Sequence, residues 1–217
     1  MSSTPPWRLK ELVPAEVTRC LARRPTLIVP VGSTEQHGAH LPLGIDTILV
    51  ERLADDLSAR FGILRAPAVE YAANRDPHRP LPGSAPLGRK TLHRLMNELI
   101  EAWELGSGVR EFVLVTAEGH EAHQEALSTL LVTEARVQVV DIFSLDFGAL
   151  LEQPGIPAHG GELDTSLCLH IAPQLVRMEA AEDTPRARPS LASAEKGARL
   201  YEFILDRIAV RCLHLES

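Results

Sequence analysis

The sequence lacks long apolar runs, has few aromatic residues and carries no excess of positive charge. A membrane-spanning helix needs about 20 consecutive apolar residues, and no run among the 217 residues approaches that length. Aromatic residues make up 4% of the chain, so leucine, valine, isoleucine and alanine must fill the core. The formal net charge is −7, which argues against nucleic acid or an anionic membrane surface as the main partner.

Cysteine is scarce as well. The chain has three cysteines, Cys20, Cys168 and Cys212, and their odd number and wide spacing fit reduced thiols better than a disulfide framework. The stretch "MSSTPPWRLKEL" does not contain the apolar segment of a secretory signal. We therefore expect a cytoplasmic protein in which Cys168, which lies in an apolar stretch, serves packing.

The composition is ordinary for a soluble globular protein, with 45% apolar and 24% charged residues. A length of 217 residues predicts a single domain over 1–217. Apolar runs typical of strands alternate with segments of helical periodicity. Strands are predicted at 26–31, 64–69, 111–116 and 137–143, and helices at 46–61, 90–106, 121–135, 163–171 and 194–211. This alternation predicts an α/β fold whose mainly parallel sheet is covered by helices on both faces.

Potential metal ligands gather in "PVGSTEQHGAHLPLGIDT", directly after the first predicted strand. Glu35 and His37 are two residues apart, so in an extended segment both side chains point to one face. A carboxylate beside an imidazole suits a divalent ion such as zinc, manganese or iron. Asp46 begins a predicted helix, where it would either bridge two ions or cap the helix. Gln36 and His40 would either support a ligand from behind or only form loop hydrogen bonds.

A second segment, "AEGHEAHQ", follows the strand at 111–116. Its first histidine, His120, lies at a tight glycine turn beyond the carboxyl end of that strand. In parallel sheets, ligands bind outside the carboxyl ends of the strands, so we expect His120 to meet Glu35 and His37. For Glu121 and His123 we expect an exposed first helical turn, where an acidic residue is favourable for the helix dipole.

A third segment, "AHGGELDT", offers His159, Glu162 and Asp164. A histidine flanked by glycines in a loop suits a general acid or base, because imidazole titrates near neutral pH. Asp164 would either join the site or cap the helix that follows, and the sequence favours neither interpretation.

With these motifs the sequence resembles the creatininase family. The resemblance is close in "PVGSTEQHGAHLPLGIDT" and continues through "PHRPLPGS", "EGH", "HGGELDTSLCLHIAP" and "ASAEKG", in order over nearly the whole chain. It implies a three-layer α/β/α fold, two divalent metal ions (Zn, Mn or Fe) and hydrolysis of a C–N amide bond by a hydroxide held between the ions. The family includes creatininase, a deformylase and a peptidase that trims the precursor of mycofactocin, so a cyclic amide, a formamide or a short peptide is implied as the substrate. Family members often form hexamers, which implies a homo-oligomer.

The resemblance also implies roles for individual residues. Glu35 and His37 would bind different metal ions, and Asp46 would bridge the two ions. His120 would complete the first metal site. His159 matches a histidine proposed to carry a proton in the reaction.

The chain departs from the family's pattern near the second metal ion. Ala122 stands where creatininase has a glutamate ligand, and we infer that Glu162 compensates for it. The family usually reads Asn-Gly-His-Gly-Gly-Asn where this chain has Glu118-Gly-His-Glu-Ala-His123. The added acidic residues favour a cationic or amine-bearing substrate. They also fit the alternative of a catalytically inactive relative that acts as a binding or structural partner in a biosynthetic pathway.

Overall fold

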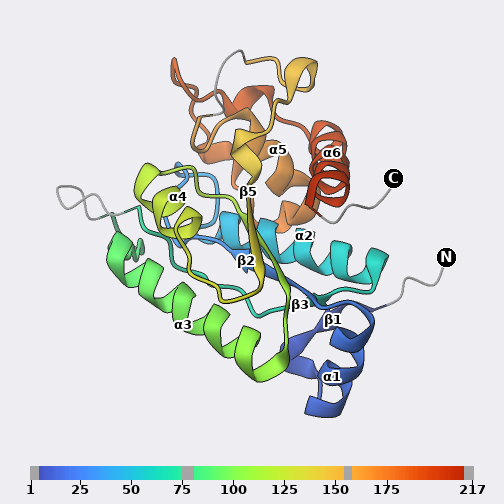
Figure 1. The fold of residues 1–217 in the computed structure, drawn as a ribbon. Coiled ribbons are helices and arrows are strands. Elements are labelled where there is room, and N and C mark those ends of the chain that lie inside the picture. Colours follow the sequence, from blue (N-terminus) through green and yellow to red (C-terminus); the bar gives the residue numbers. More distant parts are fainter. Residues whose placement is uncertain (1–4, 75–80, 154–157, 213–217) are drawn as a thin grey trace.

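The computed structural model of the chain describes residues 5–74, 81–153 and 158–212 (Figure 1). A five-stranded sheet with the order β1-β3-β2-β4-β5 lies at its centre, and every pair of neighbouring strands is parallel. The strands are β1 (Trp7–Arg8), β2 (Thr26–Val31), β3 (Leu64–Arg65), β4 (Glu111–Thr116) and β5 (Arg136–Asp141). The helices are α1 (Pro14–Arg23), α2 (Ile45–Phe61), α3 (Arg89–Ser107), α4 (Glu121–Ser128), α5 (Glu162–Ile171) and α6 (Ala194–Cys212). The predicted α/β class with a parallel sheet is confirmed.

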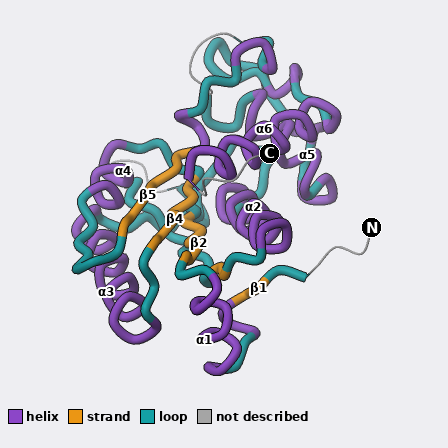
Figure 2. The backbone as a smooth tube through the Cα atoms, turned by 45° about the vertical axis from the view of Figure 1, so that its right-hand side comes forward, coloured by secondary structure: helices purple, strands orange, loops and turns teal. Residues whose placement is uncertain are grey.

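Helices cover both faces of the sheet, as Figure 2 shows. Side chains alternate along each strand, so Ile28 of β2 packs into one apolar cluster with α2, α5 and α6. Its neighbours Leu27 and Val29 pack into a second cluster with α1, α3 and α4. The same alternation holds in β4, where Val113 faces the first cluster and Phe112 the second. The result is the predicted three-layer α/β/α arrangement.

Two elements near the N-terminus were not predicted from the sequence. The strand β1 has only two residues, pairs with β3 and is held by the Arg8 guanidinium, which donates two hydrogen bonds to Asp55 of α2 (2.7 and 3.0 Å). The helix α1 begins with Pro14, and Glu16 accepts a hydrogen bond from the backbone N–H of Val13 (3.0 Å). Proline in the first turn and a glutamate reaching back to the start are local helix signals.

The predicted helix at 121–135 was too long, because α4 ends at Ser128. Side chains of α3 capture the backbone N–H groups that a longer helix would need. Glu104 accepts hydrogen bonds from the backbone of 133–135, with distances of 2.6 to 3.0 Å, and Asn97 accepts one from Leu131 (2.7 Å). The predicted strand at 64–69 was also too long, since β3 covers Leu64–Arg65 and only Val69 forms a further bridge, to Val31.

The topology opens a crevice at the carboxyl ends of β2 and β4, which are neighbours in the centre of the sheet. After β2 the chain enters α2 on one face, and after β4 it enters α4 on the other face. Such a reversal leaves a crevice between the two loops that leave the strands. The first and second ligand-rich segments of the sequence lie in these two loops.

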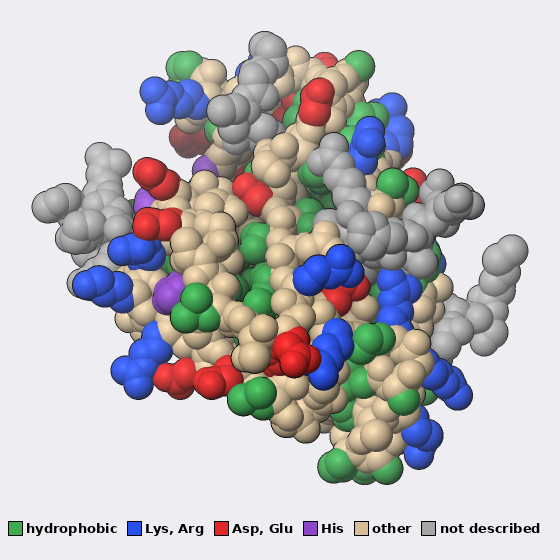
Figure 3. Space-filling model, viewed as in Figure 1, with side chains coloured by type: hydrophobic (Ala, Val, Ile, Leu, Met, Phe, Trp, Pro, Cys, Tyr) green, Lys and Arg blue, Asp and Glu red, His purple; other side chains and the backbone are tan. Residues whose placement is uncertain are grey.

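The molecular surface in the view of Figure 3 carries lysine, arginine, aspartate and glutamate side chains in mixed positions rather than one continuous basic patch. This agrees with the negative net charge of the sequence.

Within the described ranges, no helix is long and apolar enough to cross a membrane. The first half of the proline-rich "PHRPLPGS" segment, with His78, lies outside the described residues.

Candidate metal centre

The loop after β2 holds the first three predicted ligands close together. His37 is almost completely buried, with 1% of its side chain exposed, and its Nε2 lies 3.2 Å from Oδ1 of Asp46. Asp46 is in the first turn of α2, where its Oδ2 accepts a hydrogen bond from the hydroxyl of Ser33 (2.6 Å). Gly44, and not Asp46, is the N-cap residue of α2. The carboxylate of Asp46 is therefore directed at the site and does not cap its helix.

Two groups of side chains bring their possible ligand atoms within 4.8 Å of one another. One group consists of Glu35, His37 and His159, and the other of Glu35, Asp46 and Glu118. Glu35 belongs to both groups. The resemblance implied that Asp46 would be the shared ligand, whereas here the shared residue of the two groups is Glu35.

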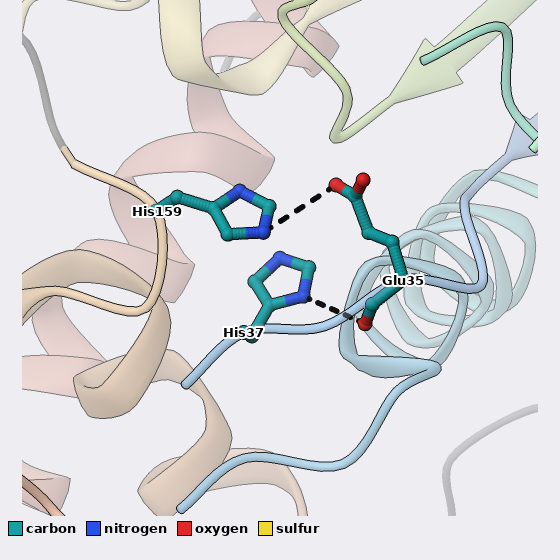
Figure 4. Close-up of side chains that lie close together, drawn as sticks. All are labelled: Glu35, His37 and His159. Carbon is teal, nitrogen blue, oxygen red and sulfur yellow. Dashed lines mark hydrogen bonds and ion pairs between the residues drawn. The ribbon is translucent and has the colours of Figure 1, made fainter. Parts of the chain in front are cut away.

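His159 reaches the site from the loop before α5, as Figure 4 shows. Its ring stacks on that of His37, with the centroids 3.8 Å apart. Its Nε2 lies 2.6 Å from the backbone oxygen of Gln36 and 3.6 Å from Oε1 of Glu35. The next residue, Gly160, has a φ of 67°, and a Cβ there would lie 2.8 Å from the backbone oxygen of His37. Only glycine therefore fits where the two histidine loops meet.

Glu118 was not predicted as a ligand, although it lies two residues after the end of β4, at the expected edge of the sheet. Its side chain is buried. Oε1 accepts a hydrogen bond from the backbone N–H of His120 (2.8 Å), and Oε2 accepts one from the Asn74 amide (2.7 Å). The same Asn74 nitrogen also donates to Glu35. The sequence did contain a signal for this role. Glu118 follows a strand in the same "EGH" segment as His120, which was predicted as a ligand.

The electrostatics of the cluster suit a cation. Burial, followed by the negative charges of Glu118 and Asp46, raises the pKa of Glu35 to about 9. For His37, burial works against the charged form, but the contact with Asp46 outweighs it and raises the pKa to about 10. Protons thus take the place of positive charge among clustered carboxylates. Carboxylates and imidazoles in such proximity are a donor set for zinc, manganese or iron, so the residues present fit a divalent ion.

His120 comes to the same pocket but lies outside both ligand groups. Its side chain is exposed, and Nδ1 accepts a hydrogen bond from the backbone N–H of Ala122 (3.2 Å), which makes it the N-cap of α4. His120 lines a pocket of about 320 Å³ together with Glu35, Glu118 and His159. Its role as a metal ligand stays a prediction.

Glu162, predicted to compensate for the missing ligand, is not brought to the cluster. It is buried at the start of α5. Its carboxylate pairs with Lys196 of α6 and accepts hydrogen bonds from the backbone N–H groups of Glu152 (2.9 Å) and Gln153 (2.8 Å). These partners satisfy the carboxylate and tie the loop before α5, through Glu152 and Gln153, to α5 and α6. The structure thus gives Glu162 a structural role, and the inference that it replaces the missing ligand is not supported.

The prediction that His123 lies on an exposed helical turn was wrong. Its side chain is fully buried. Nδ1 accepts a hydrogen bond from the backbone N–H of Ala73 (3.4 Å), and Nε2 lies 2.9 Å from the hydroxyl of Thr116. Burial lowers the pKa of His123 to about 4, so the ring is neutral at physiological pH. Glu121, in contrast, is exposed as predicted.

The remaining polar residues support the loops. Nε2 of the buried His40 lies 2.9 Å from the hydroxyl of Thr165, so His40 ties the loop after β2 to α5 and belongs to neither ligand group. Asp164 accepts a hydrogen bond from the backbone N–H of Gly160 (2.7 Å), while Gly161 is the N-cap of α5. Burial raises the pKa of the Asp164 carboxyl. Asp164 therefore braces the turn that carries the catalytic candidate and does not cap the helix.

Comparison with known proteins decides the family. The creatininase family model, described as creatinine amidohydrolase, matches residues 10–190. The chain belongs to the creatininase family. The mycofactocin precursor peptide peptidase of Mycolicibacterium smegmatis is 30% identical over 86% of this chain and 84% of its own length. The creatinine amidohydrolase of Pseudomonas putida is 26% identical over 74% of this chain and 70% of its own length.

Solved structures of the family share the fold. A crystal structure of creatinine amidohydrolase (creatininase) superposes with a TM-score of 0.81, covers 95% of this chain and 98% of that chain, and is 23% identical. Other creatininase structures are a manganese form (TM-score 0.79) and a mutant of Zn-Zn type (TM-score 0.77). The family fold is thus shown, and the solved creatininase structures include manganese and zinc forms.

Proposed function

We propose that this chain is a metal-dependent hydrolase that cleaves a C–N amide bond and holds two divalent ions. The observation that supports it best is the pair of ligand groups sharing Glu35 at the carboxyl ends of β2 and β4. These groups lie in a chain of the creatininase family, and two of its relatives are a mycofactocin precursor peptide peptidase and a creatinine amidohydrolase. The proposed protein ligands carried over from the sequence are Glu35, His37, Asp46 and His120.

The residues have distinct proposed roles. When bound, two divalent ions supply Lewis-acid activation of the amide carbonyl and of water. Ser33 fixes the carboxylate of Asp46, and the Asn74 amide fixes that of Glu35. As the oxygen of water adds to the carbonyl carbon and the C–N bond breaks, His159 takes the proton that water loses and delivers it to the leaving nitrogen. Gly160 and Asp164 orient His159 for that transfer.

A short peptide is the substrate class that the cavities favour. The pocket of about 320 Å³ beside the ligand groups shares Ala158 and His159 with a second pocket of about 730 Å³. Among the described residues, the second pocket is lined by the loop after β2 and by 180–187. A substrate that extends past His159 would occupy both pockets, which a small cyclic amide does not need. The similarity to mycofactocin precursor peptide peptidases points in the same direction.

Hydrolysis of a substrate panel by the metal-loaded protein tests the proposal. The panel contains cyclic ureides and lactams, formamides and short peptides, each with zinc, manganese or iron. We expect peptide cleavage that chelators abolish and metal restores. Cleavage of only a cyclic amide would overturn the assignment of a peptide substrate. If the protein hydrolyses no member of the panel, the proposal that it is a hydrolase is overturned.

A catalytically inactive relative is the second candidate function, and the placement of His120 and Ala122 favours it. His120 lies outside both ligand groups, and Ala122 has no ligand atom. Such a protein would bind a partner in a biosynthetic pathway through the same surface. Metal analysis of the purified protein separates the candidates, since two ions per chain favour the enzyme and none favours the binding partner.

A further inference from the structure

The carboxylate of Glu118 is directed at the same point as that of Glu35. One nitrogen of the Asn74 amide donates to Oε2 of both glutamates. A single donor can bond two oxygens only when both face it. The oxygens of Glu35, Glu118 and Asp46 lie within 4.8 Å of one another. Oxygens bound to one zinc ion at about 2.0–2.2 Å lie roughly 3–4 Å apart, so small side-chain adjustments would bring all three to one ion.

In their ionised form, these buried carboxylates need a compensating positive charge. Asp46 and Glu118 are 2% and 7% exposed, and buried carboxylates are costly unless they are paired or bind a metal. In the part of the chain that the structure describes, only histidines form ion pairs with the three, namely His37 with Asp46 and His159 with Glu35. Glu118 forms no ion pair in that part of the chain; its side chain accepts from the backbone N–H of His120 and from the Asn74 amide, and it hydrogen-bonds with the carboxyl of Glu35.

We propose that Glu118 is a metal ligand, which shares one ion with Glu35 and Asp46 and adds a carboxylate to the centre in a chain that has Ala122 at the position of the creatininase glutamate. This inference rests on the metal site of the proposed function. In the sequence, Glu118 precedes His120 by two residues. Ala122, at the position of the glutamate ligand of creatininase, follows His120 by two. The loop after β4 bends so that the side chain of Glu118 is buried while that of His120 is exposed.

The alternative donor, Glu162, provides the matched control. Both glutamates are buried, and both accept hydrogen bonds from backbone N–H groups. Glu162, however, pairs with Lys196 and belongs to neither ligand group. Glu118→Gln and Glu162→Gln therefore remove the same charge from two buried sites, of which only one faces the cluster. In Glu118→Gln, the amide oxygen can still accept from the backbone of His120, so the loop keeps that hydrogen bond.

The test measures bound metal per chain and metal affinity for the full-length protein and both variants, with zinc and manganese, after desalting. Far-UV circular dichroism and the melting temperature of the metal-free proteins check the fold. We expect two ions in the unmodified chain and in Glu162→Gln. We expect Glu118→Gln to retain one ion, or to bind one of its two ions at least about tenfold more weakly.

The outcomes separate this inference from the proposed function. A folded Glu118→Gln variant that binds two ions with unchanged affinity overturns the proposal that Glu118 is a ligand, but leaves the proposed function standing. An unmodified chain that binds metal without hydrolysing any substrate overturns the enzyme, while loss of an ion in Glu118→Gln still supports the ligand. An unmodified chain that binds no metal overturns both. Loss of an ion in Glu162→Gln but not in Glu118→Gln restores Glu162 as the ligand.

Discussion

Glu35 lies between the two halves of the candidate site, because its carboxylate belongs to both ligand groups. Its loop is fixed on both sides. The backbone N–H of Glu35 donates to Leu43 (2.9 Å), and its backbone oxygen lies 3.2 Å from Nδ1 of His37. A change at this one residue is therefore expected to affect both ligand groups, whereas a change at His159 is expected to affect only one.

Two substitutions separate metal binding from proton transfer. Glu35→Ala removes the shared carboxylate, so we expect loss of bound metal and of all activity. His159→Ala removes the proton carrier, so we expect full metal content and a kcat lower by about 10²- to 10⁴-fold. Metal analysis and steady-state kinetics of both variants check this. Full metal in Glu35→Ala would contradict the ligand assignment, and loss of metal in His159→Ala would make His159 a ligand.

His123 predicts a pH dependence of stability. Its pKa of about 4 in the folded protein lies below the value of about 6.5 expected in the unfolded chain. Folding therefore opposes protonation, and the stability contributed by neutral His123 is complete above about pH 6.5 and is lost as the pH falls toward 4. The loss amounts to about 3 kcal/mol at most, at about 1.4 kcal/mol per pH unit.

Urea unfolding of the metal-free protein at pH 7.5 and pH 4.5 measures this loss. In His123→Gln the buried group stays neutral at both pH values. We expect the variant to lose less stability than the unmodified chain between the two conditions, even if it is less stable overall. Equal losses in the two proteins would show that His123 does not titrate in this way.

At the scale of elements, α5 and α6 approach closely at Gly197. A Cβ at this position would lie 1.9 Å from the backbone oxygen of Ser166 in α5. Backbone atoms cannot move aside as a flexible side chain can, so any larger residue would push the helices apart. This contact also sets the place of Lys196, the partner of Glu162, beside α5.

Gly197→Ala is therefore expected to destabilise the protein by about 1–3 kcal/mol or more through overpacking. Gly106 of α3 offers a matched control, since a Cβ there would meet nothing within 4 Å. Gly106→Ala should leave stability unchanged or raise it by up to about 1 kcal/mol, because alanine favours the helix. Urea denaturation midpoints of both variants provide the measurement. A neutral effect at Gly197 would mean that the two helices can separate without cost.

For the whole molecule, bound metal should link the loops that leave β2 and β4. A ligand that binds only the folded state stabilises it, by about 2.7 kcal/mol at a concentration of 100 times its Kd. For a chain of this size, that corresponds to a rise in melting temperature of roughly 5–10 °C. We expect zinc or manganese to produce this rise, a chelator to reverse it and Glu35→Ala to show none. Equal melting temperatures with and without metal would contradict the proposed centre.

Assembly into a homo-oligomer stays a prediction, which light scattering can measure.

The sequence by itself determined the elements whose signals are local. The apolar runs of β2 and β4 and the helical periodicity of α2, α3 and α6 predicted these elements to within a few residues. The parallel topology followed from their alternation. It placed Glu35, His37 and His120 at one edge of the sheet before any contact was known, since loops that leave neighbouring parallel strands must share that edge.

Only the tertiary structure decided which side chains become partners. Lys196 reaches Glu162 across 34 positions, and Glu104 ends α4 from a different helix. Glu118 meets Glu35 because Asn74, from a third loop, bonds to both. A sequence pattern shows which residues are apolar or ionisable over a few turns. The partner of a buried charge is instead set by contacts between distant segments, because only packing decides which charges leave water together.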